Sequence, residues 1–293
     1  MNNAQKALVL GGATGLLGQA MVTILRESGW AADTVGGADV DLRAPDAADA
    51  LSLLVDKLEP SVIVNAIAYT QVDAAEEDVE TAFLLNRSLP AMLGRLVKTR
   101  GCGLVHFSTD FVFNGKKNQP YTSDDVPDPL CVYGKSKLAG EDALLSLDLP
   151  RCLIIRTAWL FGPGKKNFVS TILQLCKQKK SLQVVHDHIG SPTYTLDLAQ
   201  YTLKLLEAEG SGLFHVVNSG MASWCELASE ATRLAQTECL ITPVPSSAYP
   251  QKATRPAYSV LDCEALSRLT GIVPRPWPRA LREYILKAFP PAE

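Results

Sequence analysis

The stretch that decides the fold is KALVLGGATGLLG, residues 6–18, in which a short apolar run leads directly into the glycines Gly12, Gly15 and Gly18. Glycine lets the backbone turn tightly and approach a pyrophosphate closely, and the helix start that follows offers unpaired N–H groups and a partial positive charge. Glycines also mark ordinary strand-to-helix turns, and the spacing here is G-x-x-G-x-x-G instead of G-x-G-x-x-G. Because the loop follows the first predicted strand, we interpret it as a phosphate-binding loop.

Outward from this loop, the first half of the chain alternates short apolar runs with helical patterns. Further runs of strand character occupy residues 61–68, 103–109 and 151–162, and helical patterns occupy 16–28 and 78–100. Strands separated by helices favour parallel pairing with crossover connections. The sequence therefore predicts an α/β fold with a doubly wound parallel sheet of Rossmann type.

The second half is less regular and is rich in proline between Pro243 and Pro278. Patterns typical of a helix, a strand, a helix and a strand occupy, in that order, residues 167–178, 181–187, 195–209 and 212–218. We expect an NAD(P)-binding domain made of residues 1–158 and about 190–218, and a smaller discontinuous substrate domain made of about 159–189 and 219–293. Such a lobe would lie over the carboxyl edge of the sheet, where open α/β sheets bind their ligands.

The composition is that of an ordinary globular protein and excludes several classes of partner. The 293 residues carry a net charge of −3 without a long block of like charge, so we expect neither nucleic acid nor an anionic membrane as a partner. No uncharged apolar run approaches the ~20 residues of a membrane span, and the first apolar run is too short for a signal peptide. Seven scattered cysteines without a Cys-x-x-Cys pair indicate reduced thiols and a cytoplasmic protein.

Tyr133 and Lys137 open a predicted helix four residues apart, which places them on one face. A tyrosine normally has a pKa near ~10, and a neighbouring ammonium favours its phenolate. Such a phenol can give a proton to a carbonyl oxygen that is receiving a hydride. An exposed helix start would show the same spacing. The hydroxyls of Ser108 and Thr109, at the end of an apolar run, are placed to bind the same oxygen, and either one is a candidate.

Several motifs occur in the order seen in extended short-chain dehydrogenases/reductases, which this chain resembles. They are the glycine loop, NAIAYTQVDAAE (65–76), STDFVF (108–113), the Tyr-x-x-x-Lys pair and RTAWLFG (156–162). Later segments are similar to the dTDP-4-dehydrorhamnose reductase family over nearly the whole length. These segments are GSPTYTLDLA (190–199), LFHVVNSGMASWCELA (213–228), RPAYSVLD (255–262) and PWPRAL (276–281).

The resemblance implies roles for particular residues. Thr109, Tyr133 and Lys137 would be catalytic: Tyr133 would donate the proton, Thr109 would bind the keto oxygen, and Lys137 would lower the tyrosine pKa and hold the nicotinamide ribose. The implied cofactor contacts are Gly12, Gly15, Leu16, Leu17, Gly18, Asp41, Leu42, Ala68, Tyr69 and Thr70, together with Tyr133 and Lys137; we count Ala68–Thr70 as ending a fourth strand. The implied substrate contacts are Thr109, Asp110, Trp159 and Val72, and for Trp159 a core position is the alternative.

The implied activity is reduction by NADPH or NADH of the C4 keto group of dTDP-4-dehydro-6-deoxy-L-mannose, which yields dTDP-L-rhamnose. One alternative is a reductase of another nucleotide-linked 4-keto-6-deoxy sugar. Another is a non-catalytic NADP-binding subunit similar to the regulatory subunit of methionine adenosyltransferase. An epimerase or dehydratase is disfavoured because Phe111 follows Asp110 where a dehydratase needs an acid–base pair. A homodimer is a possible assembly.

The chain departs from the family pattern at two positions. Ser123 stands where relatives often carry a glutamate, and His188 stands where they carry a glutamine, which puts the specific sugar in question. His186 and His188 alternate as on a strand, but no Cys or Glu cluster accompanies them, so we expect no metal site. The choice between NAD and NADP stays open, because Asp39, Asp41 and Arg43 all follow the second predicted strand.

Overall fold

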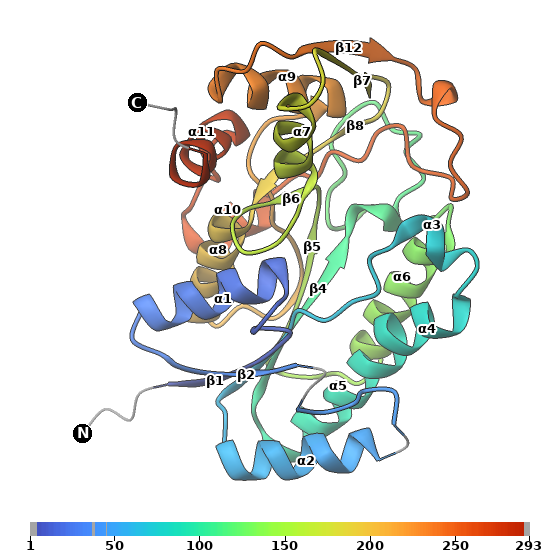
Figure 1. Cartoon of the computed structure of the whole chain (residues 1–293). Helices are drawn as coiled ribbons and strands as arrows, with labels where there is room; N and C mark the ends of the chain where they lie inside the picture. The colour runs from blue at the N-terminus through green and yellow to red at the C-terminus, as the bar shows by residue number, and fades with distance from the viewer. Residues whose placement is uncertain (1–4, 37–38, 45, 290–293) are drawn as a thin grey trace.

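A computed structural model describes residues 5–36, 39–44 and 46–289 (Figure 1). Its main element is a six-stranded parallel sheet with the order β10-β5-β4-β3-β1-β2. The strands are β1 (Lys6–Leu10), β2 (Ala31–Val35), β3 (Val62–Asn65), β4 (Gly103–Thr109), β5 (Cys152–Thr157) and β10 (Gly212–His215). The predicted doubly wound α/β fold is thus confirmed. The strand before Ala68 is β3, so our count of it as the fourth strand was wrong.

Helices cover both faces of this sheet, which explains why β3, β4 and β5 are buried along their whole length. On one face lie α1 (Leu16–Glu27), α8 (Thr195–Glu207) and α10 (Glu264–Thr270). On the other lie α2 (Ala47–Leu58), α5 (Leu89–Arg100) and α6 (Val132–Leu145). The chain leaves β1 first for β2 on one side and then for β3 on the other. The carboxyl ends of β1 and β3 therefore flank a topological switch point, where such sheets bind ligands.

Residues 78–100, which we expected to form one helix, contain a change of helix type. The segment consists of α4 (Val79–Phe83), a π-helical turn η1 (Leu84–Ser88) and α5. Pro90 lies in the first turn of α5 and has no N–H to donate. The π turn places Asn86 in the interior, where its side chain is fully buried. Single π turns are often found at functional sites, and this one lies beside α6.

The remaining elements form an upper lobe over the carboxyl edge of the sheet (Figure 1). Its helices are α7 (Phe168–Cys176), α9 (Trp224–Leu234) and α11 (Trp277–Ala288), and η3 (Ser246–Ala248) is a short 3₁₀ turn. Its strands pair as β6 (Leu160–Phe161) with β9 (Thr193–Tyr194), β7 (Ser181–Val185) with β12 (Leu240–Val244), and β8 (Ile189–Gly190) with β11 (Ala222–Ser223). Capping boxes begin α7 and α9. The apolar faces of these helices meet in a second core around Val169, Leu227 and Leu281.

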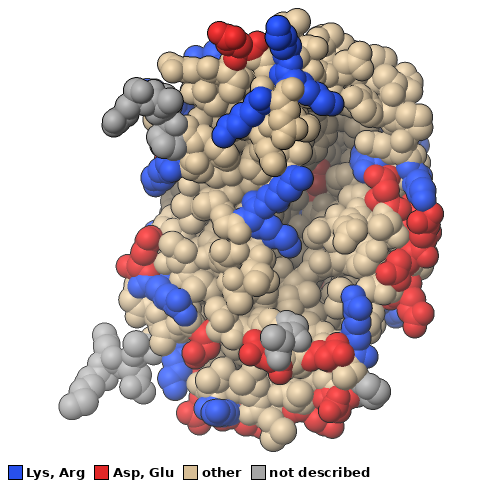
Figure 2. All heavy atoms as spheres, viewed as in Figure 1, with Lys and Arg blue, Asp and Glu red and all other residues tan. Residues whose placement is uncertain are grey.

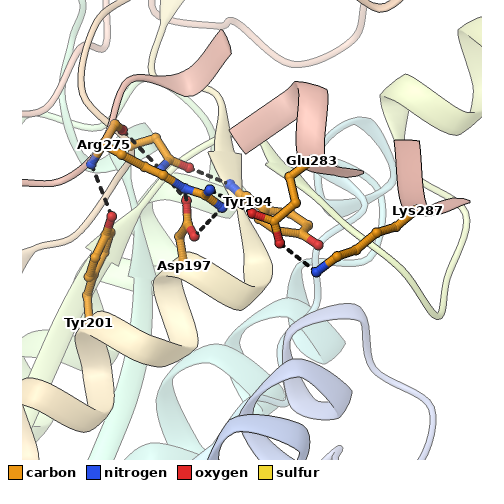
Figure 3. A network of polar contacts seen from close by, with 7 residues as sticks. Tyr194, Asp197, Tyr201, Arg275, Glu283 and Lys287 are labelled. Atoms are coloured by element: carbon orange, nitrogen blue, oxygen red, sulfur yellow. Dashed lines mark hydrogen bonds and ion pairs between the residues drawn. The ribbon is translucent and has the colours of Figure 1, made fainter. Parts of the chain in front are cut away.

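An ion-pair network joins this lobe to α8, which packs on the sheet (Figure 3). The Arg275 guanidinium donates to both carboxylate oxygens of Asp197 on α8, at 2.7 Å each. It also donates to Glu283 on α11 at 2.6 Å, and Lys287 binds the same glutamate at 2.7 Å. The Arg275 backbone N–H donates to the Tyr201 hydroxyl at 3.1 Å. The two parts of the molecule are therefore held together by paired charges as well as by apolar contacts.

None of the helices in the described part of the chain combines the length and the apolar character that crossing a membrane requires.

Candidate active site

The glycine loop forms a close turn between β1 and α1. Gly11 has a φ of +79°, which glycine adopts at little cost. A Cβ at Gly18 would lie 2.2 Å from the Gly11 carbonyl oxygen, and one at Gly15 would lie 2.6 Å from it. The start of α1 therefore packs directly against the end of β1, and the backbone N–H groups at this helix start suit a pyrophosphate. The predicted cofactor residues that the structure places at this turn are Gly12, Gly15, Leu16, Leu17 and Gly18. We overlooked Gly11, although the paired glycines that follow the strand mark it.

Asn86 joins the loop after β3 to α6 through hydrogen bonds. The Tyr69 N–H donates to Asn86 Oδ1 at 2.9 Å, and Asn86 Nδ2 donates to the Tyr69 carbonyl at 3.1 Å. The same Nδ2 lies 2.9 Å from the Ser136 hydroxyl on α6. Ala68, Tyr69 and Thr70 thus run beside α6, and Val72 begins the short helix α3 (Val72–Ala75). The pattern of residues 78–100 carried no signal for this role of Asn86.

The second predicted group of cofactor contacts lies beyond β2. Asp41 is exposed, and its Oδ1 accepts a hydrogen bond from the Arg43 N–H at 3.0 Å, while Leu42 is partly buried. Neither residue contacts the glycine turn through a hydrogen bond in the described part of the chain. The role of these two residues in cofactor binding stays a prediction.

Thr109, Tyr133 and Lys137 are brought together although 28 residues separate the first from the last. Thr109 ends β4, Tyr133 is the second residue of α6, and Lys137 lies one turn further along. The Phe111 ring packs edge-on against the Tyr133 ring, with 5.5 Å between centroids. Burial raises the pKa of the Tyr133 phenol above its ordinary value, and the nearby Thr109 hydroxyl opposes this change. Although the residue as a whole is partly exposed, its phenol therefore keeps its proton at neutral pH.

Lys137 is almost completely buried, with 1% of its surface exposed. Its ammonium donates to the Phe107 carbonyl on β4 and lies 3.5 Å from His106 Nε2. Burial lowers the pKa of Lys137 to about 8, and the charge of Glu141 opposes this change. Lys137 is not among the groups that shift the pKa of Tyr133. The ammonium is therefore held by the strand, one helical turn from the phenol.

A buried ion pair lies behind Lys137. Arg156 donates to Glu141 through Nη2 at 2.6 Å and through Nε at 3.0 Å, and both side chains are at most 4% exposed. The Ser108 hydroxyl also donates to Glu141. Of the two candidate hydroxyls, Ser108 is thus occupied by this pair, and Thr109 is the one beside the phenol. Sequence reasoning missed the pair because its members lie on separate elements.

Asp110 is buried beside Thr109 and is bound from two directions. The Ser259 hydroxyl, from the upper lobe, donates to its Oδ2 at 2.5 Å, and the Thr109 hydroxyl donates to its Oδ1 at 3.1 Å. Burial raises the pKa of Asp110 to about 6, although these hydrogen bonds oppose the change. The carboxylate is thus kept in the interior against the cost of burying its charge.

Replacing Asp110 with Asn should remove a pH-dependent loss of stability. Between the ordinary pKa of 3.8 and the folded value of about 6, the folded protein holds a proton that the unfolded chain has lost, so stability falls as pH rises. From pH 5 to pH 8 the wild type should lose about 1.4 kcal/mol relative to Asp110→Asn. Urea unfolding of both proteins at several pH values measures this difference. A difference that does not vary with pH would contradict it.

Trp159 has a strained backbone and a stacked side chain. Its φ of +47° is unusual for a residue with a Cβ, and such strain persists where the surrounding structure enforces it. The indole stacks on Trp224 at 3.6 Å between centroids and 6° between planes. A Cβ at Gly190 would lie 2.4 Å from the Trp159 ring, so that glycine makes room for it. Trp159 remains partly exposed and also contacts the upper-lobe core.

The histidines at 186 and 188 do not lie on a strand, so the expected alternation on one face was wrong. Strand β7 ends at Val185, and both histidines occupy the loop that follows. Asp187 between them accepts hydrogen bonds from the Ser246 N–H and hydroxyl, both at 2.9 Å. Within residues 5–36, 39–44 and 46–289, no three His, Cys, Asp or Glu side chains gather as metal ligands would.

The surface is hollowed where the sheet edge meets the upper lobe (Figure 2). The hollow runs between the upper lobe and the side that carries α3, α4 and α6, and Lys and Arg side chains lie along part of its rim. A rim of this charge suits a ligand that bears phosphate groups.

Comparison with known proteins adds to this geometry. The model of the family described as the RmlD substrate binding domain matches residues 6–289. The chain is 46% identical to the spore coat polysaccharide biosynthesis protein SpsK of Bacillus subtilis, over 78% of this chain and 79% of that protein. It is 35% identical to a dTDP-4-dehydrorhamnose reductase of Aggregatibacter actinomycetemcomitans, over 94% of this chain and 97% of the relative. A crystal structure of dTDP-4-dehydrorhamnose reductase from Bacillus anthracis in complex with NADP superimposes with a TM-score of 0.92 at 30% identity, covering 98% of this chain and all of that one.

Proposed function

Because the chain belongs to the RmlD substrate binding domain family, we propose that it reduces the C4 keto group of dTDP-4-dehydro-6-deoxy-L-mannose with NADPH, giving dTDP-L-rhamnose. The observation that carries the proposal is that Thr109 and the helix bearing Tyr133 and Lys137 lie at the same carboxyl edge of the sheet as the glycine turn. The reductases of this name align with nearly the whole chain, so both the cofactor half and the substrate half have counterparts.

The residues divide the chemistry between them. When bound, the reduced nicotinamide supplies a hydride to C4 of the sugar. Tyr133 gives its phenolic proton to the keto oxygen, so that hydride and proton together yield the alcohol. Thr109 turns its hydroxyl proton from Asp110 to the same oxygen and holds that oxygen in line with the phenol. Lys137, one helical turn from the phenol, supplies a positive charge that stabilises the phenolate formed after proton transfer. A lysine whose pKa is lowered to about 8 can also return a proton to that phenolate.

Asp110, Trp159 and Val72 are proposed to recognise the sugar. The Asp110 carboxylate accepts hydrogen bonds, and with a pKa of about 6 it is largely ionised at neutral pH. The Trp159 indole offers an apolar wall to the sugar ring and its methyl group, and the stack on Trp224 fixes the orientation of that wall. Val72 begins α3 next to the loop proposed to line the nicotinamide.

We propose that residues 1–158 and about 190–218 hold the dinucleotide, and that about 159–189 and 219–293 hold the sugar nucleotide. The two apolar cores support this division, since α8 and β10 pack with the sheet while α7, α9 and α11 pack with one another. Leu266 of α10 also packs in the sheet core, although it belongs to the segment 219–293 that we assign to the sugar nucleotide.

We place the protein in the cytoplasm, a location that the seven free cysteines support. A homodimer stays a prediction that sedimentation equilibrium tests.

The decisive assay follows loss of reduced nicotinamide absorbance. We expect turnover when the purified protein is mixed with dTDP-4-dehydro-6-deoxy-L-mannose and NADPH, and parallel reactions with NADH give the cofactor preference. Tight NADP binding without turnover of any sugar would favour the non-catalytic regulatory subunit. Faster turnover of a different nucleotide-linked 4-keto-6-deoxy sugar would reassign the substrate, and Ser123 would then be the first position to examine.

A further inference from the structure

The first turn of α6 is not capped by its own sequence. Cys131 precedes the helix, and its side chain makes no capping hydrogen bond. The first N–H groups of a helix lack partners within it and are usually satisfied by a nearby Ser, Thr, Asp or Asn. Here the Val132 N–H donates to Oε1 of Glu76 at 2.8 Å, from a residue 56 positions earlier. A carboxylate at this place also faces the positive end of the helix dipole.

This turn carries the proton donor. Tyr133 follows Val132 directly, so any fraying of the turn would move its phenol. On the other side, Gly134 packs so closely against Phe111 that a Cβ would lie 2.2 Å from the Phe111 carbonyl oxygen. The Ser136 hydroxyl donates to the Tyr133 carbonyl at 2.8 Å. Glu76 is therefore the side chain that caps the beginning of the helix, while Phe111 packs against its first turn and Ser136 binds it from within.

Glu76 itself is anchored through the helix that precedes it. Asp73 in α3 accepts from both terminal nitrogens of Arg255, at 2.7 and 3.1 Å, and from the Ala253 N–H at 3.0 Å. Hydrogen bonding to Arg255 lowers the pKa of Asp73 to about 2, so the pair is charged at any working pH. Arg255 belongs to the upper-lobe segment that ends at Ser259, which binds Asp110. Helix α3 is thus fastened to the lobe on one side and to α6 on the other.

We propose that Glu76 is a positioning residue, which sets the place of Tyr133 by capping the first turn of α6 from helix α3. The inference rests on the proposed function in one respect, namely that Tyr133 is the proton donor. Glu76 acts through the Val132 N–H, and Asp73 keeps it in place.

Three variants test the proposal. Glu76→Ala removes the cap, Glu76→Gln keeps an oxygen that accepts from Val132, and Glu80→Ala is the matched control on an exposed glutamate of α4. We expect Glu76→Ala to lower kcat by about tenfold or more with both KM values within about twofold, because a misplaced acid costs rate more than binding. Glu76→Gln should return kcat to within about threefold of wild type. Glu80→Ala should behave as wild type.

Hydrogen exchange provides a readout that does not depend on activity. The peptide covering residues 131–136 should exchange faster in Glu76→Ala than in wild type, while Glu76→Gln and Glu80→Ala should match wild type. Unchanged kcat and exchange in Glu76→Ala would overturn the proposal, and so would equal losses of kcat in the Ala and Gln variants. If the wild type turned over no sugar, the proposed function would fail, and the exchange data would still decide whether Glu76 holds the helix.

Discussion

Replacing Tyr133 with Phe should lower kcat by about 10²–10⁴-fold, because the variant keeps the ring but loses the proton that the keto oxygen receives. The ring is expected to stay in place, since its edge-on contact with Phe111 needs no hydroxyl. The measurement is the rate of NADPH oxidation with saturating sugar nucleotide. The KM for NADPH should change little, because the glycine turn that we propose binds the cofactor phosphates lies on a different element.

The control for this variant is cofactor binding. Titration of Tyr133→Phe with NADPH should give an affinity close to that of the wild type, which separates loss of the acid from loss of the fold. Thr109→Val, which removes the neighbouring hydroxyl at nearly constant volume, should give a smaller loss than Tyr133→Phe. Activity of the phenylalanine variant near the wild-type level would remove Tyr133 from its proposed role.

Replacing Glu141 with Ala should destabilise the protein by about 3–5 kcal/mol, since it leaves the Arg156 guanidinium buried without its partner. The effect is large because one terminal nitrogen of Arg156, Nη1, already lacks a hydrogen-bond partner among the described residues. The Ser108 hydroxyl would lose its acceptor as well. The free energy of unfolding in urea measures the change.

An exposed ion pair serves as the comparison for Glu141. Glu230 binds Arg233 at 2.7 Å, but the Arg233 side chain is 68% exposed. Glu230→Ala should therefore cost less than about 1 kcal/mol. The double variant Glu141→Leu with Arg156→Met, which removes both charges together, should recover most of the loss. Similar losses in Glu141→Ala and Glu230→Ala would show that burial does not set the strength of the first pair.

Local patterns predicted those parts of the fold in which a short segment carries its own signal. The glycine turn and α1 could be predicted because glycines directly after an apolar run are typical of a strand-to-helix turn. The observed helix Leu16–Glu27 ends within one residue of the expected 16–28. The structure of residues 78–100 could not be predicted in the same way. Their helical pattern is continuous. The π turn instead accompanies the hydrogen bond between Asn86 and the backbone of Tyr69, which lies 17 positions earlier in the sequence.

The sequence by itself determined the class of sheet, the glycine turn and the four-residue spacing of Tyr133 and Lys137, because each follows from periodicity or from backbone freedom within a few residues. Only the tertiary structure decided which groups surround them. Glu76 binds the first turn of α6 from 56 positions away in sequence, and Ser259 binds Asp110 from 149 positions away. Arg156 binds Glu141 from 15 positions away. Burial raises the pKa of Asp110 and lowers that of Lys137. Desolvation depends on what packs around a group in three dimensions, so no local pattern reports it.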